Sequence, residues 1–454
     1  NHGRRLEMNV KEEIYGRLLT LGSFFQTRWG LRFQSREDFD RWQLKRLKRF
    51  IRGIIPQAKM FDECAMLSIN DLPIMDKSKL LSNFSEYNTR GIGYEQAIST
   101  ALRAEETRDF NPTIDDVTVG LSSGTTGTRG VFLVNPREQS RWAGVALART
   151  LSNSLLKRLL VPWEKPISIA LFLRASSNLY RKLSSNRVSF EYYDLLESFP
   201  KLFARLSKSF PDILVAPASV LRSLADEMLR GRVFVQPTQV ISVAEVLDSE
   251  DSAVIQKAFG KPIYQIYQAS EGFIGYTCEK GNMHLNESYM YIEKEWLDTE
   301  KTRFYPIITD FSRETQMIVR YRLDDVLRIG EPCSCGRVEQ TLEAIEGRAD
   351  EILWLRSKQT GELERIFPDL LRRTMSIASG KILDYRIIQR NKVWDLFLRI
   401  NEDRFTVEND VNAAVESLCK TLNVEVPKLQ FHEWVELPAG AKRVRIHFEK
   451  EGAI

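Results

Sequence analysis

The strongest local signal in the sequence is a loop of small and hydroxyl-bearing residues, Ser122-Ser123-Gly124-Thr125-Thr126-Gly127-Thr128-Arg129-Gly130. It lies between two short β-prone runs, Val117–Leu121 and Val131–Val134. Glycines let a backbone bend around a ligand and present its N–H groups, and the hydroxyls add further donors. A polar hairpin loop is the alternative, but it does not need so dense a run. We therefore predict a loop that binds a polyphosphate. It is not a Walker A loop, because no Gly-Lys-Ser/Thr sequence follows.

Strand-like and helix-like segments alternate after this loop. The apolar runs expected to form buried strands are Ile167–Leu173, Ile213–Ala216, Val240–Val243 and Ile263–Tyr267. The helical patterns lie near residues 138–160, 191–208, 218–230 and 249–259. This alternation predicts an α/β fold in which many strands pair in parallel.

The two ends of the chain differ from this middle part. Residues 8–110 read as helical and charged, and the last hundred or so residues read as a small α+β unit. A chain of 454 residues also exceeds the size at which one core keeps growing. We therefore predict a large domain over residues 8–350, helical over 8–110 and α/β over 111–350, and a small domain over residues 351–454.

Composition excludes several classes of protein. Hydrophobic residues make up 43% of the chain, and 65 basic against 61 acidic residues leave a net charge of +4. This balance does not argue for nucleic acid or an anionic membrane as a partner. No apolar run approaches the length of a membrane span, and no apolar segment near the first residues predicts a secretory signal. Five cysteines do not form a disulfide framework, so we expect a reducing, cytoplasmic compartment.

Two motifs after the loop contain acidic residues that could bind parts of a ligand. Glu271 lies in Tyr267-Gln268-Ala269-Ser270-Glu271-Gly272, directly after the strand that begins at Ile263. A carboxylate at this end of a parallel strand, beside a phosphate site, can hold Mg²⁺. Asp325 ends the motif Arg320-Tyr321-Arg322-Leu323-Asp324-Asp325, and an acidic residue at a strand end can accept both hydroxyls of a ribose. Taken alone, each segment could be an ordinary strand end or a surface charge cluster.

Two further motifs lie toward the C-terminus. Gly347-Arg348-Ala349-Asp350 stands where the character of the chain changes. Lys442 lies on the Gly-containing turn Leu437-Pro438-Ala439-Gly440-Ala441-Lys442, from which a lysine could reach into a neighbouring cleft. A surface charge cluster and a basic hairpin are the alternatives.

The order of these five motifs resembles that of the adenylate-forming superfamily, which comprises acyl-CoA synthetases, aryl-CoA ligases and peptide-synthetase adenylation domains. In that family a Ser/Thr/Gly loop precedes Tyr-x-x-Thr-Glu, Tyr-Arg-Thr-Gly-Asp, Gly-Arg-x-Asp and a C-terminal Gly-Lys. Counterparts span residues 115–445 or so. The Gly-Thr-Arg-Gly end of the loop and the Cys-x-Cys-Gly-Arg element at Cys333 resemble the phenylacetate–CoA ligase-like branch. This branch includes capsule-biosynthesis adenylating proteins and coenzyme F390 synthetase-related proteins.

The resemblance implies roles for individual residues. The loop residues expected to wrap the ATP phosphates are Ser122, Ser123, Gly124, Thr125, Thr126, Gly127 and Thr128, with Arg129 in place of the family's lysine. The other residues expected to bind the nucleotide or line the acid pocket are Glu245, Tyr267, Ser270, Asp325 and Arg348. Glu271 would bind Mg²⁺, and Asp350 would be the hinge of the small domain. Lys442 would be the adenylation lysine, with Lys450 as the alternative because Ala441 replaces the family's glycine.

Four residues can form a metal site. Cys278, His284, Cys333 and Cys335 supply three thiolates and one imidazole, which is a ligand set for structural zinc. Unliganded buried thiols are the alternative. Relatives in the resembling branch sometimes carry zinc in this region.

The resemblance implies an ATP-dependent ligase that activates a carboxylic acid, most simply an aromatic one, as acyl-AMP. The acyl group would pass to coenzyme A or to an amine. Two alternatives remain open: transfer of AMP to a hydroxyl, as in coenzyme F390 synthesis, and a non-catalytic nucleotide-binding protein. Dimers are common in this branch, so a homodimer is compatible with the resemblance.

Overall fold

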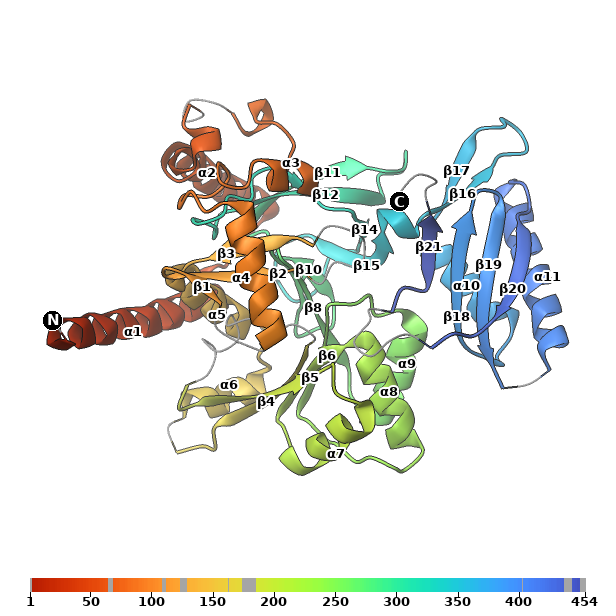
Figure 1. Ribbon diagram of the computed structural model, residues 1–454, viewed down its shortest axis with the longest axis horizontal. Coiled ribbons are helices and arrows are strands. Elements are labelled where there is room, and N and C mark those ends of the chain that lie inside the picture. Colours follow the sequence, from red (N-terminus) through yellow and green to blue (C-terminus); the bar gives the residue numbers. More distant parts are fainter. Residues whose placement is uncertain are drawn as a thin grey trace. The chain divides into compact units, whose positions relative to one another are not determined.

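The computed structural model describes residues 2–63, 68–107, 112–122, 129–161, 163–173, 185–401, 403–436 and 443–449, with side chains from residue 12 onward. The chain forms two compact units (Figure 1). The first contains Asn1–Glu295, Pro306–Leu323 and Ile329–Glu343, and the second contains Trp296–Tyr305, Asp324–Arg328 and Ala344–Ile454. The second unit thus combines the predicted C-terminal domain with short segments from earlier in the chain, because several strands begin in one unit and end in the other.

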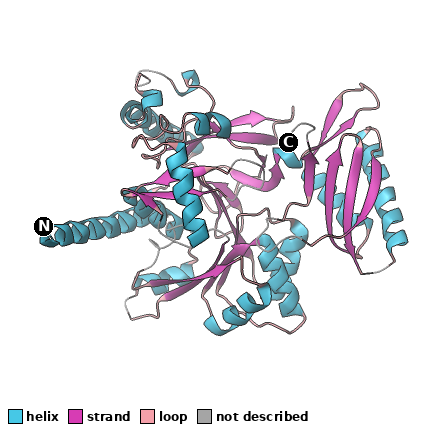
Figure 2. Cartoon of the chain, viewed as in Figure 1, coloured by secondary structure: helices cyan, strands magenta, loops and turns pink. Residues whose placement is uncertain are grey.

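The first unit begins with helices, as the charged N-terminal sequence predicts (Figure 2). Its helical elements are α1 (His2–Phe25), η1 (Gln26–Gly30), α2 (Arg36–Gly53), η2 (Ile55–Gln57), η3 (Lys59–Phe61), η5 (Ile69–Asp71), α3 (Lys77–Ser82) and α4 (Tyr94–Thr107). The start of α2 is capped by Ser35, whose hydroxyl accepts a hydrogen bond from the backbone N–H of Asp38.

A small antiparallel sheet carries the predicted phosphate loop. It consists of β1 (Thr113–Ile114), β2 (Val117–Leu121) and β3 (Val131–Val134). Val119 and Leu133 are fully buried and face each other in the register of β2 and β3. They pack with Ala97 and Ala101 of α4 in one apolar cluster, so the helix supports the strands from which the loop extends.

The predicted parallel strands form the centre of the first unit. Strands β5 (Val188–Asp194), β4 (Ile167–Leu173), β6 (Ile213–Pro217), β7 (Gln239–Val243) and β8 (Ile263–Ala269) are neighbours in that order, and all pair in parallel. Alternate residues face two separate cores: Phe172 and Leu214 belong to one cluster, whereas Leu171 and Val215 belong to the other. Burial on both faces explains why these strands read as continuous apolar runs.

Helices flank this sheet. They are α5 (Pro136–Thr150), α6 (Asn153–Leu160), α7 (Phe199–Ser209), α8 (Ala218–Leu229) and α9 (Ser249–Phe259). One sequence prediction is wrong here: residues 191–208 are not one helix, because β5 extends to Asp194 and α7 begins only at Phe199. The aromatic, strand-favouring sequence of β5 and the proline at the second position of α7 explain the division.

Antiparallel strands extend the sheet beyond β8. They are β9 (Gly272–Thr277), β10 (Met283–Leu285), β11 (Met290–Trp296), β12 (Arg303–Asp310), β13 (Tyr321–Arg322), β14 (Asp325–Ile329) and β15 (Thr341–Arg348). Strand β9 returns alongside β8, and β10 lies between β9 and β15. Strands β12 and β15 each pass from one unit into the other.

The second unit has its own core. Its remaining elements are η7 (Ala349–Glu351), β16 (Leu353–Arg356), β17 (Leu363–Ile366), α10 (Pro368–Ala378), β18 (Ile382–Arg390), β19 (Val393–Ile400), α11 (Arg404–Leu422), β20 (Lys428–Glu433) and β21 (Ile446–Glu449). The four-stranded sheet has the order β20-β19-β18-β21. The fully buried Trp394 of β19 packs in the same cluster as Val407 and Val411 of α11. Within the described residues, no helix is both long and apolar enough to cross a membrane.

Candidate active site

The two ends of the predicted phosphate loop lie together. The backbone N–H of Ser122 donates to the carbonyl oxygen of Gly130 at 2.8 Å, and the N–H of Gly130 donates to the Ser122 hydroxyl, also at 2.8 Å. Residues Ser123, Gly124, Thr125, Thr126, Gly127 and Thr128 lie outside the described residues. Strands β2 and β3 thus continue their pairing up to the base of the loop.

Two cationic side chains flank the base of this loop. Arg129 forms a bidentate ion pair with Glu105 of α4, with N–O distances of 2.5 and 3.0 Å. The second cation, Lys77 at the start of α3, was not singled out by the sequence. Its Cε lies 3.6 Å from the position that a Cβ on Gly130 would occupy. Only the fold could reveal Lys77, because α3 and the loop are far apart in sequence.

Glu271 lies in the two-residue connection between β8 and β9, at the carboxyl end of a strand that is parallel to β7. The Ser270 hydroxyl donates to a carboxylate oxygen of Glu271 at 2.8 Å. Tyr267 is buried in β8, and the β8–β9 register shifts between Tyr267 and Gln268. Such a bulge redirects the side chains that follow it, and here it precedes the predicted magnesium ligand.

Gln268 fixes the shape of this connection. Its amide nitrogen donates to the carbonyl oxygens of Ala269 at 2.8 Å and Gly272 at 3.0 Å. Its amide oxygen accepts a hydrogen bond from the indole N–H of Trp142 on α5, at 3.0 Å. Neither residue was predicted to be part of the site, and no local pattern in the sequence pairs them.

A buried carboxylate, Asp310, supports the same connection from β12. Its Oδ2 would lie 2.7 Å from a Cβ placed on Gly272, so only glycine fits there. Burial raises the pKa of Asp310, and hydrogen bonds from Ser312 oppose that rise without cancelling it. Asp310 thus forms a second, unpredicted support beneath the residue that follows Glu271.

Glu245 lies at the same edge of the parallel sheet, just after β7. One of its carboxylate oxygens accepts the backbone N–H of Ser219, at 2.8 Å, in the first turn of α8. Ala244 before it has φ = +65°, a left-handed conformation that is unfavourable for a residue with a side chain. Strained backbone of this kind persists where the surrounding structure holds it and occurs often at functional sites. The turn directs Glu245 toward α8, and its predicted place in the acid pocket remains a prediction.

The second unit brings three predicted residues together. Asp325 begins β14, Arg348 ends β15, and Asp350 lies in η7. Burial alone would lower the pKa of Arg348, but the carboxylates of Asp350, Asp325, Asp324 and Glu351 raise it overall. The Arg348 guanidinium lies 3.9 Å from carboxylate oxygens of both Asp324 and Asp350. The ribose motif and the hinge motif therefore form one electrostatic cluster.

Gly347 explains the shape of the hinge motif. Its φ is +135°, and an added Cβ would lie 2.7 Å from Oε2 of Glu351. Glycine is therefore required at this position.

Lys442 and its alternative Lys450 lie outside the described residues. Near Lys442, Arg443 and Arg445 both reach Asp384, with N–O distances of 2.6 and 3.3 Å.

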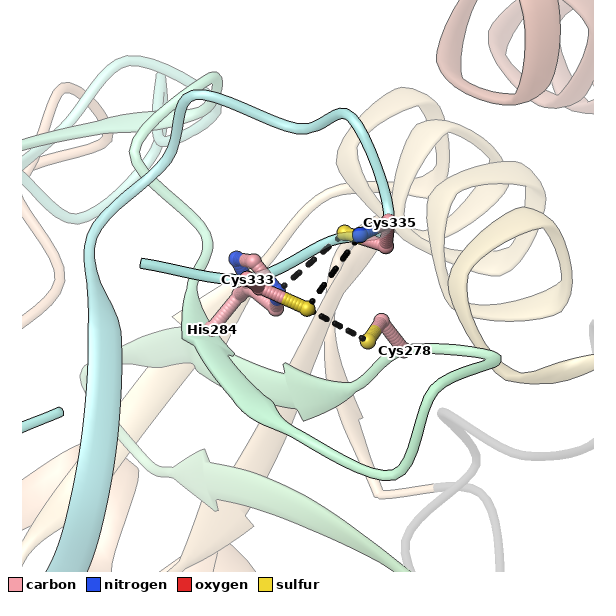
Figure 3. A group of neighbouring side chains, drawn as sticks. All are labelled: Cys278, His284, Cys333 and Cys335. Atoms are coloured by element: carbon pink, nitrogen blue, oxygen red, sulfur yellow. Dashed lines mark hydrogen bonds between the residues drawn. The ribbon is translucent and has the colours of Figure 1, made fainter. Parts of the chain in front are cut away.

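The four predicted zinc ligands lie together on the first unit (Figure 3). All four ligand atoms are within 4.8 Å of one another. The sulfurs of Cys278 and Cys333 are 3.7 Å apart, and the Cys335 sulfur is 3.4 Å from Nε2 of His284. Typical Zn–S and Zn–N bonds at tetrahedral angles place sulfur atoms about 3.8 Å apart and sulfur and nitrogen about 3.5 Å apart. These two distances match the spacing of ligands around a tetrahedral zinc ion.

The surroundings of these residues favour metal binding. The other imidazole nitrogen of His284 lies 3.1 Å from the carbonyl oxygen of Glu339, which orients the ring and leaves Nε2 as the ligand atom. Burial lowers the pKa of His284, so the neutral form that binds metals predominates. The Cys333 sulfur accepts hydrogen bonds from Asn282 at 3.1 Å and from the backbone N–H of Cys335 at 3.4 Å.

A buried network of hydrogen bonds and one ion pair supports the four candidate zinc ligands. The Glu339 carboxylate pairs with Arg149 of α5 at 2.8 Å and accepts the Tyr276 hydroxyl at 2.5 Å. The Ser288 hydroxyl donates to the same carboxylate at 2.6 Å. Because burial raises the pKa of Tyr276 well above its ordinary value, the tyrosine stays protonated and can donate. This network connects α5, β9 and the segment that carries Cys333 and Cys335.

Comparison with known proteins gives structural neighbours only. No protein-family model matches the chain, and no curated protein matches its sequence. The 2-hydroxyisobutyryl-CoA ligase in its postadenylation state superposes with a TM-score of 0.63 at 15% identity, covering 92% of this chain and 91% of the ligase. The acyl acid amido synthetase AtGH3.15 superposes with a TM-score of 0.54 at 11% identity, covering 88% and 89% of the two chains.

The amide bond synthetase McbA from Marinactinospora thermotolerans is a third neighbour. It has a TM-score of 0.50 and 13% identity, and the match covers 72% of this chain and 68% of McbA. All three neighbours are members of the adenylate-forming superfamily. The chain therefore has the fold of adenylate-forming enzymes, as the order of the motifs predicted.

Proposed function

We propose that this protein is an ATP-dependent, AMP-forming ligase. It activates a carboxylic acid as acyl-AMP with release of pyrophosphate and then transfers the acyl group to coenzyme A or an amine. The observation that supports this proposal best is the shared fold, which extends over 92% of the chain and carries all five motifs in order. One neighbour was crystallised with an acyl-AMP and coenzyme A, and another in complex with 2,4-DB.

Several described residues have tasks in the proposed mechanism. The ATP phosphates are held by Lys77 and by the base of the loop at Ser122 and Gly130. Arg129 also binds a phosphate if its ion pair with Glu105 breaks. Asp325 accepts the ribose hydroxyls, and Tyr267 lies against the adenine. Because phosphoryl chemistry of this kind depends on positioning and charge stabilisation, no covalent enzyme intermediate is needed.

The donor set at Glu271 fits Mg²⁺. A carboxylate whose second oxygen is oriented by Ser270 offers the hard oxygen ligand that this cation takes beside phosphates. When bound, Mg²⁺ neutralises charge that develops on the phosphate oxygens. Ser270 orients the carboxylate, and Gln268 fixes the backbone of the connection that carries it. The zinc at Cys278, His284, Cys333 and Cys335 is structural, because four protein ligands leave no open coordination position.

The proposal also concerns which class of acid is activated and which group accepts the acyl chain. We propose an aromatic acid, on the basis of the resemblance to the phenylacetate–CoA ligase-like branch. Pyrophosphate exchange into ATP over a panel of aromatic and aliphatic acids tests the first half-reaction. Exchange with at least one acid is expected, and Glu271→Gln serves as the inactive control. ATP binding without exchange for any acid would instead favour a non-catalytic nucleotide-binding protein.

Mass spectrometry of the products then identifies the acceptor. Incubation with coenzyme A and with a mixture of amino acids should give a thioester or an amide, together with free AMP. A product that retains AMP on a hydroxyl would show an adenylyltransferase and would contradict the proposed second half-reaction.

A further inference from the structure

Helix α1 carries an apolar stripe that none of the described residues of the first unit covers. Ile14, Leu18, Leu21 and Phe25 are 54%, 61%, 53% and 48% exposed. The opposite side of the helix packs on α5, where the Thr20 hydroxyl donates to the carbonyl oxygen of Ser140 at 3.0 Å. The two helices approach so closely that a Cβ on Gly144 would lie 2.2 Å from the Thr20 carbonyl oxygen. The stripe therefore lies on the side of α1 opposite the one that packs on α5.

The spacing along the stripe is that of a coiled-coil seam. Its four residues follow one another at intervals of four, three and four. This is the alternation of d and a positions in a heptad. The spacing reads the same in both directions. In an antiparallel pair of such helices, Ile14 therefore lies opposite the second copy's Phe25, and Leu18 lies opposite the second copy's Leu21.

Gly22 is a second observation on the same face. An exposed glycine inside a helix costs about 1 kcal/mol relative to alanine, and a Cβ at Gly22 would meet nothing within 4 Å in this chain. Packing within the described residues therefore does not explain it. Because Gly22 flanks the seam, it lets a second helix approach closely and leaves room for the Tyr15 ring of that helix.

Charge and area also fit a second copy. In an antiparallel pair the flanking positions that meet across the seam are Tyr15 with Gly22 and Arg17 with Phe24, so they bring no like charges together. Apolar side chains of this size that are about half exposed leave on the order of 400–500 Å² per copy. Two copies thus bury on the order of 800–1,000 Å², the size of a weak, transient interface.

We propose that α1 is a dimerisation helix, which pairs antiparallel with α1 of a second copy through Ile14, Leu18, Leu21 and Phe25. An interface of this size is typical of weak, transient complexes, so the test covers a wide concentration range. This proposal does not depend on the enzymatic activity, because none of the four residues belongs to the candidate active site.

Sedimentation equilibrium of the full chain from about 1 to 200 μM tests it. We expect a monomer–dimer equilibrium that Leu18→Lys and Leu21→Glu each weaken about tenfold or more. In the double variant L18K/L21E, antiparallel pairing places the introduced lysine of one copy opposite the introduced glutamate of the other, so dimerisation should recover. Leu229→Lys, at a leucine of α8 that is 47% exposed, is the matched control and should dimerise like the wild type.

Three outcomes would overturn the proposal. The first is a wild-type protein that stays monomeric at 200 μM. The second is dimerisation that Leu18→Lys changes no more than Leu229→Lys does. The third is a double variant as weak as the single variants, because parallel pairing would set like charges opposite each other. Circular dichroism verifies that all variants stay folded. A monomer that binds anionic phospholipid vesicles through Leu18 would identify a membrane surface as the occupant instead.

Discussion

The indole N–H of Trp142 donates to the amide oxygen of Gln268 across 126 residues of sequence, at 3.0 Å. Gln268 in turn donates to the backbone carbonyls on both sides of Ser270 and Glu271. Helix α5 therefore holds the connection that presents the proposed magnesium ligand. Gln268 is a positioning residue: its own atoms bond to the backbone, and its effect on chemistry passes through Glu271.

Replacing this glutamine should loosen the connection without removing a ligand. We expect Gln268→Met to lower the rate of acyl-AMP formation about tenfold and to raise the Mg²⁺ concentration needed for half-maximal rate. Trp142→Phe removes one hydrogen bond of about 1 kcal/mol and should have a smaller effect in the same direction. Pyrophosphate exchange at varied Mg²⁺ measures both. A lower rate with an unchanged Mg²⁺ dependence would assign Gln268 a purely structural role.

Glu271 itself should have a larger effect. Glu271→Gln keeps the shape of the side chain but removes the charge that binds the cation, so we expect adenylation to fall by on the order of 10²-fold or more at saturating Mg²⁺. Glu300→Gln, at an exposed turn remote in sequence, is the control and should leave the rate unchanged. A normal rate for Glu271→Gln would remove this residue from the site.

The metal cluster should be necessary for stability. Purified protein is expected to contain about one equivalent of zinc, which a strong chelator releases with a fall in melting temperature. Cys335→Ser should lower zinc content and melting temperature together, whereas Cys419→Ser, a buried thiol of the second unit, should leave zinc content unchanged. Zinc-free protein that melts at the normal temperature would contradict a structural metal.

Lys442 and Asp350 should separate the two half-reactions. If the small domain delivers Lys442 to the site, Lys442→Ala should slow acid activation but leave use of synthetic acyl-AMP nearly intact, because the lysine stabilises charge only in the first step. Asp350→Pro, which restricts φ at the hinge, should do the opposite. Rates of each half-reaction, measured separately, test this. Equal slowing of both steps by Lys442→Ala would indicate a packing role, and no slowing would transfer the role to Lys450.

Asp212 should make stability depend on pH. Burial would raise the pKa of this carboxyl, but Arg158 and the hydrogen bonds from Ser168 lower it below its ordinary value. A lowered pKa in the folded state means that the stabilisation is present above the unfolded pKa, about 4, and is lost as the pH falls through the folded value.

Urea unfolding of Asp212→Asn tests this dependence. At pH 7 the variant should lose about 2 kcal/mol, which is typical for hydrogen bonds to a charged group. Near pH 3 the difference from the wild type should be much smaller. An equal loss at both pH values would show that the charge of Asp212 contributes nothing.

Local patterns in the sequence determined much of the fold. The strands β4, β6, β7 and β8 are apolar throughout, since both faces of a parallel sheet are buried, and their positions could be predicted to within a few residues. The glycine-rich loop, Glu271 and the four candidate zinc ligands could be proposed as functional groups because the chemistry of such sites demands particular residue types at particular places. The order of the motifs was enough to predict the adenylate-forming fold.

Which distant groups meet depends on the tertiary structure. It paired Arg129 with Glu105, brought Lys77 to the base of the loop and placed Asp310 beneath Gly272, and none of these contacts follows from local propensity. It also set the end of β5 at Asp194 and interleaved the two units through β12 and β15. The physical reason is that a hydrogen-bond or ion-pair partner is chosen by the path of the whole chain, whereas a sequence pattern reports only the burial and backbone preference of its own segment.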